Sequence, residues 1–117
     1  MFKNLTPHTI NLYSQDKKEK VMEISSVGSI RIQEKRIPQE NIEGFPSFSV
    51  EFMSPEISLK EGTAPITPTD ILVVSAIAGH KVKELFPLNR VVSPDTSAGA
   101  VRNEKGMILG TTAFIEY

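Results

Sequence analysis

The chain has 117 residues with a formal charge of −1, from thirteen Lys and Arg against fourteen Asp and Glu. This length predicts a single domain over residues 1–117, large enough for one core but small for enclosing a nucleotide-sized ligand alone. The balanced charge lacks the basic field that binding to DNA or RNA requires, and no Cys and two His argue against a disulfide framework or a metal site.

No membrane or export segment is predicted. Residues 1–8 lack an apolar run of signal-peptide length, and the longest uncharged apolar stretch, residues 71–79, is too short to cross a bilayer. We therefore expect a cytoplasmic protein with no membrane contact, no bound cofactor and no polymeric nucleic acid as partner.

The amino-terminal third reads as a meander of short strands. Residues 9–13 alternate polar and apolar side chains, a polar turn follows, and residues 21–24 continue the pattern. Ile30 and Ile32 predict another strand that directs Arg31 away from the core. Residues 48–52 alternate Phe or Val with polar residues, which predicts a half-buried strand inside a region of clustered prolines from 38 to 68.

The strongest strand signal is the run of four apolar residues 71–74. These side chains are apolar on both faces, so we expect the strand in the centre of a sheet with a helix covering one side. A helix is predicted over about residues 76–86, with Ser75 as its N-cap and Pro87 as its stop. Gly79 within it suggests close approach of a partner helix or a ligand.

The last quarter contains a loop of small residues, 93–103, then a turn and a strand. The pattern predicts a strand around 100–102, a turn closed by Gly106 in a left-handed conformation, and a strand over 107–117. The predicted class is α+β, a mostly antiparallel sheet with one main helix.

Arg102 is the first candidate ligand-binding residue. A guanidinium beside the backbone amides of Asn103 and the following turn can grip a phosphate with two hydrogen bonds, which a lysine cannot do. The alternative is a surface arginine that pairs with Asp95 or Glu104. The density of small residues in the loop suits close approach of a compact anion to the backbone.

Other candidates surround this loop, and each has a structural alternative. Asp95 and Thr96 could accept or donate to a ribose or adenine, or Asp95 could merely cap its own loop. Phe86 could stack on an adenine or pack in the core. The remaining candidates are Ser75, which precedes the helix, the polar pair Asn89 and Arg90, and Arg31 and Arg36 as a possible second anion site.

No enzyme motif is present. The chain lacks GxSxG, GxxxxGK[ST], HExxH and a glycine-rich dinucleotide turn, so a binding module is favoured over a catalyst. The opening Asn-Leu-Thr-Pro-His, residues 4–8, is a second unusual cluster that can tie a strand end to a neighbouring loop or contact a ligand.

Several segments together resemble a known family. They are the opening NLTPHTI (4–10), the strand 30–32, the run ILVVSA (71–76), and the ending VSPDT (92–96) with AVRNEKGMILG (100–110). In this order they resemble a family of small phage proteins that includes the phage Thoeris anti-defence sponges.

The resemblance implies immune evasion by capture of a signal. Such a sponge binds a cyclic ADP-ribose isomer made by TIR-domain enzymes in the host bacterial cytoplasm and holds it without cleaving it. It also implies a homodimer or higher oligomer and capture of cyclic oligonucleotides at a separate site, for which Arg31 or Arg36 would serve. Arg102 and Asn103 lie in the matching motif. We expect the ligand site at a dimer interface to which the predicted helix contributes.

Two other functions remain open from the sequence. One is an enzyme that degrades the same nucleotide signal. The other is a phage structural or accessory protein that binds another protein through its helix and exposed strand edges.

Overall fold

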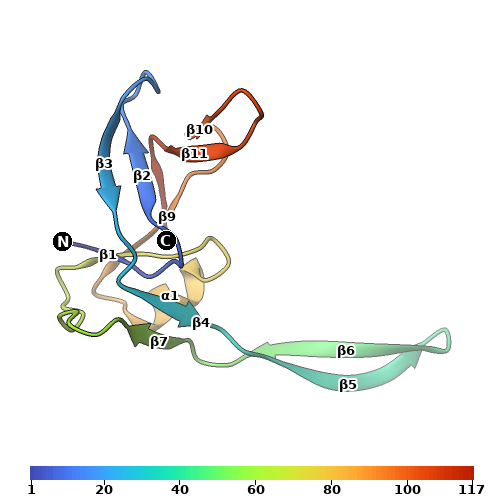
Figure 1. The fold of residues 1–117 in the computed structure, drawn as a ribbon. Coiled ribbons are helices and arrows are strands. Elements are labelled where there is room, and N and C mark those ends of the chain that lie inside the picture. The colour runs from blue at the N-terminus through green and yellow to red at the C-terminus, as the bar shows by residue number, and fades with distance from the viewer.

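A computed structural model describes residues 1–117 as a strand-rich body from which one long hairpin projects (Figure 1). It confirms the predicted α+β class with mostly antiparallel pairing and one helix. The elements are β1 (Phe2–Asn4), β2 (Ile10–Tyr13), β3 (Lys20–Ile24), β4 (Gly28–Arg31), β5 (Glu34–Ile42), β6 (Phe45–Phe52), β7 (Glu56–Leu59), β8 (Ile71–Val73), α1 (Gly79–Leu85), β9 (Arg90–Pro94), β10 (Ala100–Arg102), β11 (Ile108–Thr111) and β12 (Phe114–Glu116).

Two four-stranded sheets form the body. One has the order β1-β8-β9-β12, in which β1, β8 and β9 run parallel and β12 is antiparallel to β9. The other has the order β10-β11-β2-β3, with a parallel pairing between β11 and β2. The strands β4 and β7 pair with each other, as do β5 and β6. No helix in the structure combines the length and apolar character needed to cross a membrane.

The centre of the body is β8, as residues 71–74 predicted. Leu72 and Val74 pack on the side of the helix with Val82 and Val91, and all four are completely buried. Val73 points to the opposite side, where it joins Ile10, Ile24 and Val92. The alternation of a strand thus places β8 and β9 between two apolar clusters.

The helix is shorter than the predicted span. It begins at Gly79 after Ala78, and no side chain caps its amino end, so Ser75 is not the N-cap. Residues 75–78 instead form tight turns, with hydrogen bonds from Ala78 N to Ser75 O (3.0 Å) and from Gly79 N to Ala76 O (3.4 Å). Bonds over three residues are tighter than those of an α-helix, which delays its start by one turn. The helix ends at Leu85, with Phe86 as its C-cap before Pro87.

The carboxy-terminal strand also differs from its prediction. Instead of one strand over 107–117, β11 and β12 are separated by a bend at Thr112, and they belong to different sheets. Thr111 Oγ1 causes the break, because it contacts Ala113 O at 2.9 Å and accepts from Ala113 N at 3.2 Å. Gly106 has the predicted left-handed conformation, with φ of 79°.

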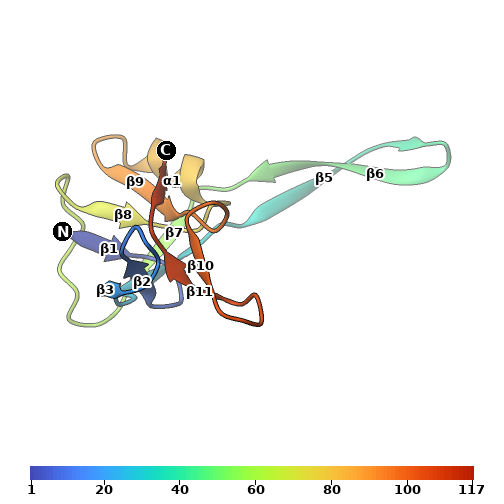
Figure 2. The same cartoon turned by 90° about the horizontal axis from the view of Figure 1, so that it is seen from above.

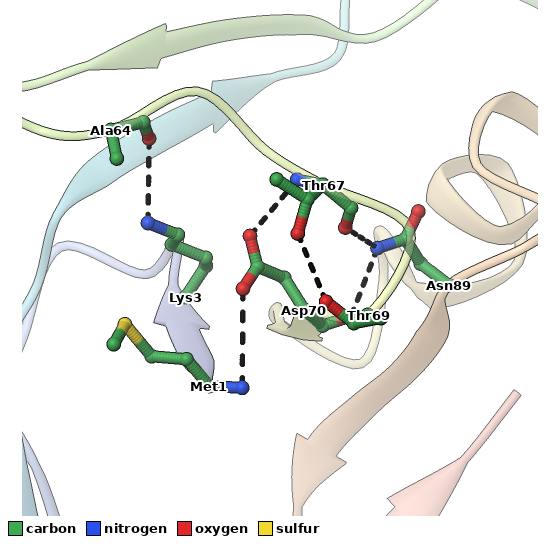
Figure 3. A network of polar contacts seen from close by, with 7 residues as sticks. All are labelled: Met1, Lys3, Ala64, Thr67, Thr69, Asp70 and Asn89. Atoms are coloured by element: carbon green, nitrogen blue, oxygen red, sulfur yellow. Dashed lines mark hydrogen bonds and ion pairs between the residues drawn. The ribbon is translucent and has the colours of Figure 1, made fainter.

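A polar network joins the amino-terminal strand to the loop before β8 (Figure 3). The buried Asp70 carboxylate accepts from Thr67 N at 3.0 Å, and the Lys3 ammonium donates to Ala64 O at 3.3 Å. Asn89, also buried, donates to Thr67 O (2.7 Å) and Asp70 O (2.9 Å). The loop that contains two prolines is therefore held by its own Asp70 and by side chains from β1 and from the turn between α1 and β9.

The hairpin of β5 and β6, which we call the arm, extends away from the body in both views (Figures 1 and 2). Its tip is a two-residue turn in which Glu43 and Gly44 both have positive φ, 51° and 82°, and Ile42 pairs with Phe45. This is the turn geometry that suits the twist of a hairpin. Sequence patterns predicted only the second strand of the arm, and its Phe and Val side chains are about half exposed.

Gly79 lies against the ring of Tyr117. A Cβ at this position would come within 2.4 Å of Tyr117 Cε2, while the Tyr117 hydroxyl is 2.9 Å from Ser93 Oγ. The close neighbour that the glycine admits is thus a side chain of the same chain, not a partner helix or ligand. The ring also makes an edge contact with the exposed His80, at 5.0 Å between centroids.

We expect Gly79→Ala to destabilise the protein by about 1–3 kcal/mol, because the ring must move, although alanine is the better helix former by about 1 kcal/mol. In a Tyr117→Ala background the same change should become neutral or stabilising. Urea denaturation of the four proteins measures this coupling. Stabilisation by Gly79→Ala alone would contradict the packing.

Candidate functional site

A pocket of about 360 Å³ lies where the two halves of the sequence motif meet. We call it the motif pocket. It is lined by His8, Thr9, Ile10, Asn11, Pro94, Thr96, Ile108, Leu109, Gly110 and Thr111. These residues come from the opening loop and β2, from the end of β9 and the loop after it, and from β11.

The parallel strands explain why distant segments meet here. β1 ends at Asn4 and β9 ends at Pro94, and both run parallel to β8. The carboxyl ends of parallel strands lie at the same edge of a sheet, which is where ligand sites form in open sheets with parallel strands. The opening loop after β1 and the loop after β9 are therefore brought to one edge.

Asn4 shapes the first wall of the pocket. Its completely buried side chain donates from Nδ2 to His8 O (2.8 Å) and Ile24 O (2.9 Å), and its Oδ1 accepts from Thr6 N (3.0 Å) and Thr6 Oγ1 (2.6 Å). Every polar atom of the amide is thus used within the chain. The role of the Asn-Leu-Thr-Pro-His cluster is to hold the turn that presents His8 and Thr9.

Asp95 shapes the second wall. Its Oδ1 accepts from Ser97 N (2.9 Å) and Ser97 Oγ (2.8 Å), and its Oδ2 accepts from Gly99 N (3.0 Å). These hydrogen bonds, chiefly those from Ser97, with help from the positive charge of Lys17, lower the pKa of Asp95 from its ordinary value. The carboxylate caps its own loop, which leaves the neighbouring Thr96 exposed at the pocket.

The third wall depends on close approach of β11 to β2. A Cβ on Gly110 would come within 2.3 Å of Asn11 O, so only glycine allows this spacing. Asn11 Nδ2 donates to Leu109 O at 3.1 Å across the two strands. Thr111, buried behind them, lies 2.7 Å from Asp95 O through its hydroxyl and so joins β11 to the second wall.

The chemistry of the pocket is an aliphatic wall with a polar rim. Ile108 and Leu109, which form the aliphatic part, are 46% and 44% exposed. Around them stand the exposed His8, Thr9 and Thr96, which offer an imidazole and two hydroxyls. Such a surface can pack against a flat ring and hydrogen-bond sugar hydroxyls.

Arg102 lies beside the pocket and makes no ion pair. Its Nη1 donates to Gly106 O (2.8 Å) and its Nη2 contacts Thr96 O (3.5 Å), while neither Asp95 nor Glu104 pairs with it. Because the side chain is exposed, its other N–H groups face solvent next to a residue of the pocket. Asn103 acts within the turn, where its Oδ1 accepts from Lys105 N and Met107 N.

The other predicted residues lie elsewhere. Asn89 is buried in the polar network described above, and Arg90 makes two hydrogen bonds of 2.8 Å to Glu116, which raise the pKa of Arg90 and lower that of Glu116. Phe86 borders a separate hollow of about 230 Å³ near Pro68. Ser75 is exposed in the turn before α1. None of these four lines the motif pocket.

The two arginines of the possible second site are on separate elements. Arg31 ends β4 and is exposed. Arg36 lies in the arm, where its guanidinium sits 4.9 Å from the centre of the Phe48 ring, a distance typical of a cation–π contact. No group of three or more His, Asp or Glu side chains is arranged to hold a metal ion.

Sequence reasoning missed most of the pocket wall. Thr9, Ile10, Ile108, Leu109 and Gly110 belong to the motif, and Asn11 follows it, but local chemistry does not mark them as ligand residues. The signal that could have found them is the motif itself, because both of its ends occur together in the resemblance and both contribute to this pocket.

Comparison with protein-family models, curated proteins and solved structures found no match to this chain.

We expect the loop after β9 to confer a dependence of stability on pH. The folded pKa of Asp95 lies below its ordinary value of 3.8, so its contribution is complete above that value and is lost as the pH falls through the folded pKa. The melting temperature of Asp95→Asn should therefore fall less steeply than that of the wild type below about pH 4. Glu104→Gln, at an exposed position of the next turn, is the matched control and should follow the wild type.

Proposed function

We propose that this protein is a phage anti-defence sponge that binds a cyclic ADP-ribose isomer in the motif pocket and holds it uncleaved in the host bacterial cytoplasm. The observation that carries the proposal is that both motif halves contribute to one pocket, residues 8–10 from the first half and Pro94, Thr96 and residues 108–110 from the second. These are the segments through which the sequence resembles the Thoeris anti-defence sponges.

The size and lining of the pocket support a nucleotide-like ligand. A volume of about 360 Å³ falls within the range of about 300–1,000 Å³ typical of small-molecule sites. Ile108 and Leu109 would pack against the adenine, and the hydroxyls of Thr9 and Thr96 would bond to the riboses. Arg102, adjacent to Thr96, would bind the diphosphate with two parallel hydrogen bonds.

The chemistry of the lining favours retention over cleavage. His8 is the one titratable side chain among the residues that line the pocket, and the nearby Asp95 carboxylate is occupied by three hydrogen bonds. General acid–base hydrolysis needs a proton donor and acceptor placed at the reacting atoms. The pocket supplies one such group, which supports a sponge over an enzyme that degrades the signal.

Affinity sets a further requirement. A sponge must compete with the host receptor, so a dissociation constant near nanomolar, about −12 kcal/mol, is needed. A pocket that is open on one side cannot readily exclude water around a diphosphate. We therefore keep the prediction that the working unit is a homodimer or higher oligomer. Because α1 does not line the motif pocket, any contribution from the helix would come from a second copy.

The test is retention followed by release. The protein is mixed with cyclic ADP-ribose isomers, washed free of unbound ligand and denatured by heat, and the supernatant is analysed by chromatography. Recovery of the intact cyclic nucleotide is expected. A linear product would identify an enzyme, and the absence of both retention and a thermal shift would favour the protein-binding alternative.

Two pairs of variants locate the site. Arg102→Ala should abolish retention, whereas Lys105→Ala, which removes a cation from the same turn, should preserve it. Thr9→Trp should fill the pocket and block binding, whereas Ser25→Trp, at an exposed position outside it, should not. If both Arg102→Ala and Thr9→Trp still retain the nucleotide, the ligand binds at another surface of the protein.

Binding of cyclic oligonucleotides at Arg31 or Arg36 is a separate proposal. Titration of Arg31→Ala and Arg36→Ala with a cyclic trinucleotide tests it, with retention of the cyclic ADP-ribose isomer as the internal control.

A further inference from the structure

We propose that the arm is a self-association surface, and that two copies of this chain pack their arms side by side in antiparallel orientation around a two-fold axis. The proposal concerns the protein without ligand and does not rest on the function proposed above. It follows from the pattern of the arm, from its lack of cover and from its charge.

The arm has one apolar and one polar face. The strand register pairs Glu34 with Phe52, Arg36 with Val50 and Pro38 with Phe48, so these residues share one face. The opposite face has the pairs of Lys35 with Glu51, Ile37 with Ser49 and Gln39 with Ser47. Such alternation is typical of a strand with one side covered by other protein.

The arm's own chain leaves the apolar face open. Phe48, Val50 and Phe52 are 46%, 47% and 50% exposed, and Ile42 and Phe45 at the tip are 64% and 72% exposed. A two-stranded hairpin by itself is only marginally stable in water, and an exposed apolar patch of this kind marks an interaction surface. We therefore expect another protein surface to cover the apolar face of the arm.

The base of the arm offers a place for its tip. There, Phe52 and Met53 border a hollow of about 220 Å³ whose other side is formed by Lys81 and Leu85 of α1. In antiparallel arms, the tip of one copy lies over the base of the other. Phe45 of each copy would then enter the hollow of its partner, and the apolar row of each arm would cover the other.

Charge favours this orientation and this class of partner. Between residues 34 and 52 the arm carries four Glu and two basic residues, a net charge of 2 − 4 = −2, which opposes nucleic acid and anionic lipid. Two acids, Glu40 and Glu43, are near the tip, whereas the base carries both signs, with Lys35, Arg36 and Lys81 beside Glu34, Glu51 and Glu84. An antiparallel arrangement keeps the two acidic tips apart, whereas a parallel arrangement would bring them together.

The surface has the size of a small interface. The apolar face of the arm contributes six residues, the tip adds Ile42 and Phe45, and the hollow adds Met53, Ser54, Pro55, Lys81, Glu84 and Leu85, about fourteen residues on each copy. A standard protein interface uses about 20–30 residues on each side, so this contact lies at the low end of interface sizes. Because the same surface meets itself, the contact closes as a dimer and does not continue as a filament.

Cross-linking gives the most direct test. The wild type has no cysteine, so Phe45→Cys and Leu85→Cys in one chain create the only two thiols. An arm of eight paired residues spans about 26 Å, whereas a disulfide requires Cα atoms within about 7 Å, so a bond between these positions must join two copies. Under mild oxidation we expect a covalent dimer. Phe45→Cys with Leu109→Cys is the matched control and should stay uncross-linked.

Sedimentation of the protein without nucleotide gives a second test. The double variant Phe48→Ser, Val50→Ser should dimerise at least about tenfold more weakly, whereas Ser47→Thr, Ser49→Thr on the polar face should match the wild type. A wild type that stays monomeric overturns the proposal, including one that binds vesicles or another protein instead. So does a dimer that is unaffected by Phe48→Ser, Val50→Ser, or a ladder of higher cross-linked species. None of these results depends on retention of a nucleotide.

Discussion

Burial of β8 on both faces is the constraint on which the rest of the body depends. Leu72 and Val74 pack toward α1 while Val73 packs toward β2 and β3, so the strand requires cover on two sides. The two layers supply that cover, and the parallel neighbours β1 and β9 complete the sheet. Because these strands are parallel, the loops that follow β1 and β9 begin at the same edge of the sheet. The motif pocket is thus a consequence of how the core is covered.

Local sequence patterns predicted the strands whose own side chains have a strong strand pattern. The apolar run of residues 71–74 and the segment Ala100–Arg102 became strands as expected. β1 was missed because its three residues are a strand only through pairing with β8, almost seventy positions later. β5 was missed because Pro38 argues against a strand. In a two-stranded arm each strand has a free edge, where a missing N–H costs little. The helix started late because turns compete for its first residues.

The candidate site was only partly predictable for a related reason. Local chemistry favours Arg102 and Thr96; Thr96 lines the motif pocket, whereas Arg102 contacts Thr96 O at 3.5 Å and lines a separate hollow with Asn103. Asn89 and Arg90 were chosen on the same grounds, but the structure uses the first in a buried network and the second in an ion pair. The sequence of a loop shows which groups it contains but not which other loop it meets. That information lay in the topology of three parallel strands, which local patterns do not encode.

The arm is connected to the body only through the hairpin of β4 and β7. It leaves the body after β4 and returns before β7, and these two strands pair directly, from Gly28 with Leu59 to Arg31 with Glu56. The arm is therefore an insertion in a hairpin that is already closed, and it adds nothing to the two apolar clusters of the core. Its length and side chains can vary without cost to the strands that build the pocket. A shortened chain that keeps Ile32, which packs against the core, and then returns to Glu56 by a tight turn would therefore retain both apolar clusters without the arm.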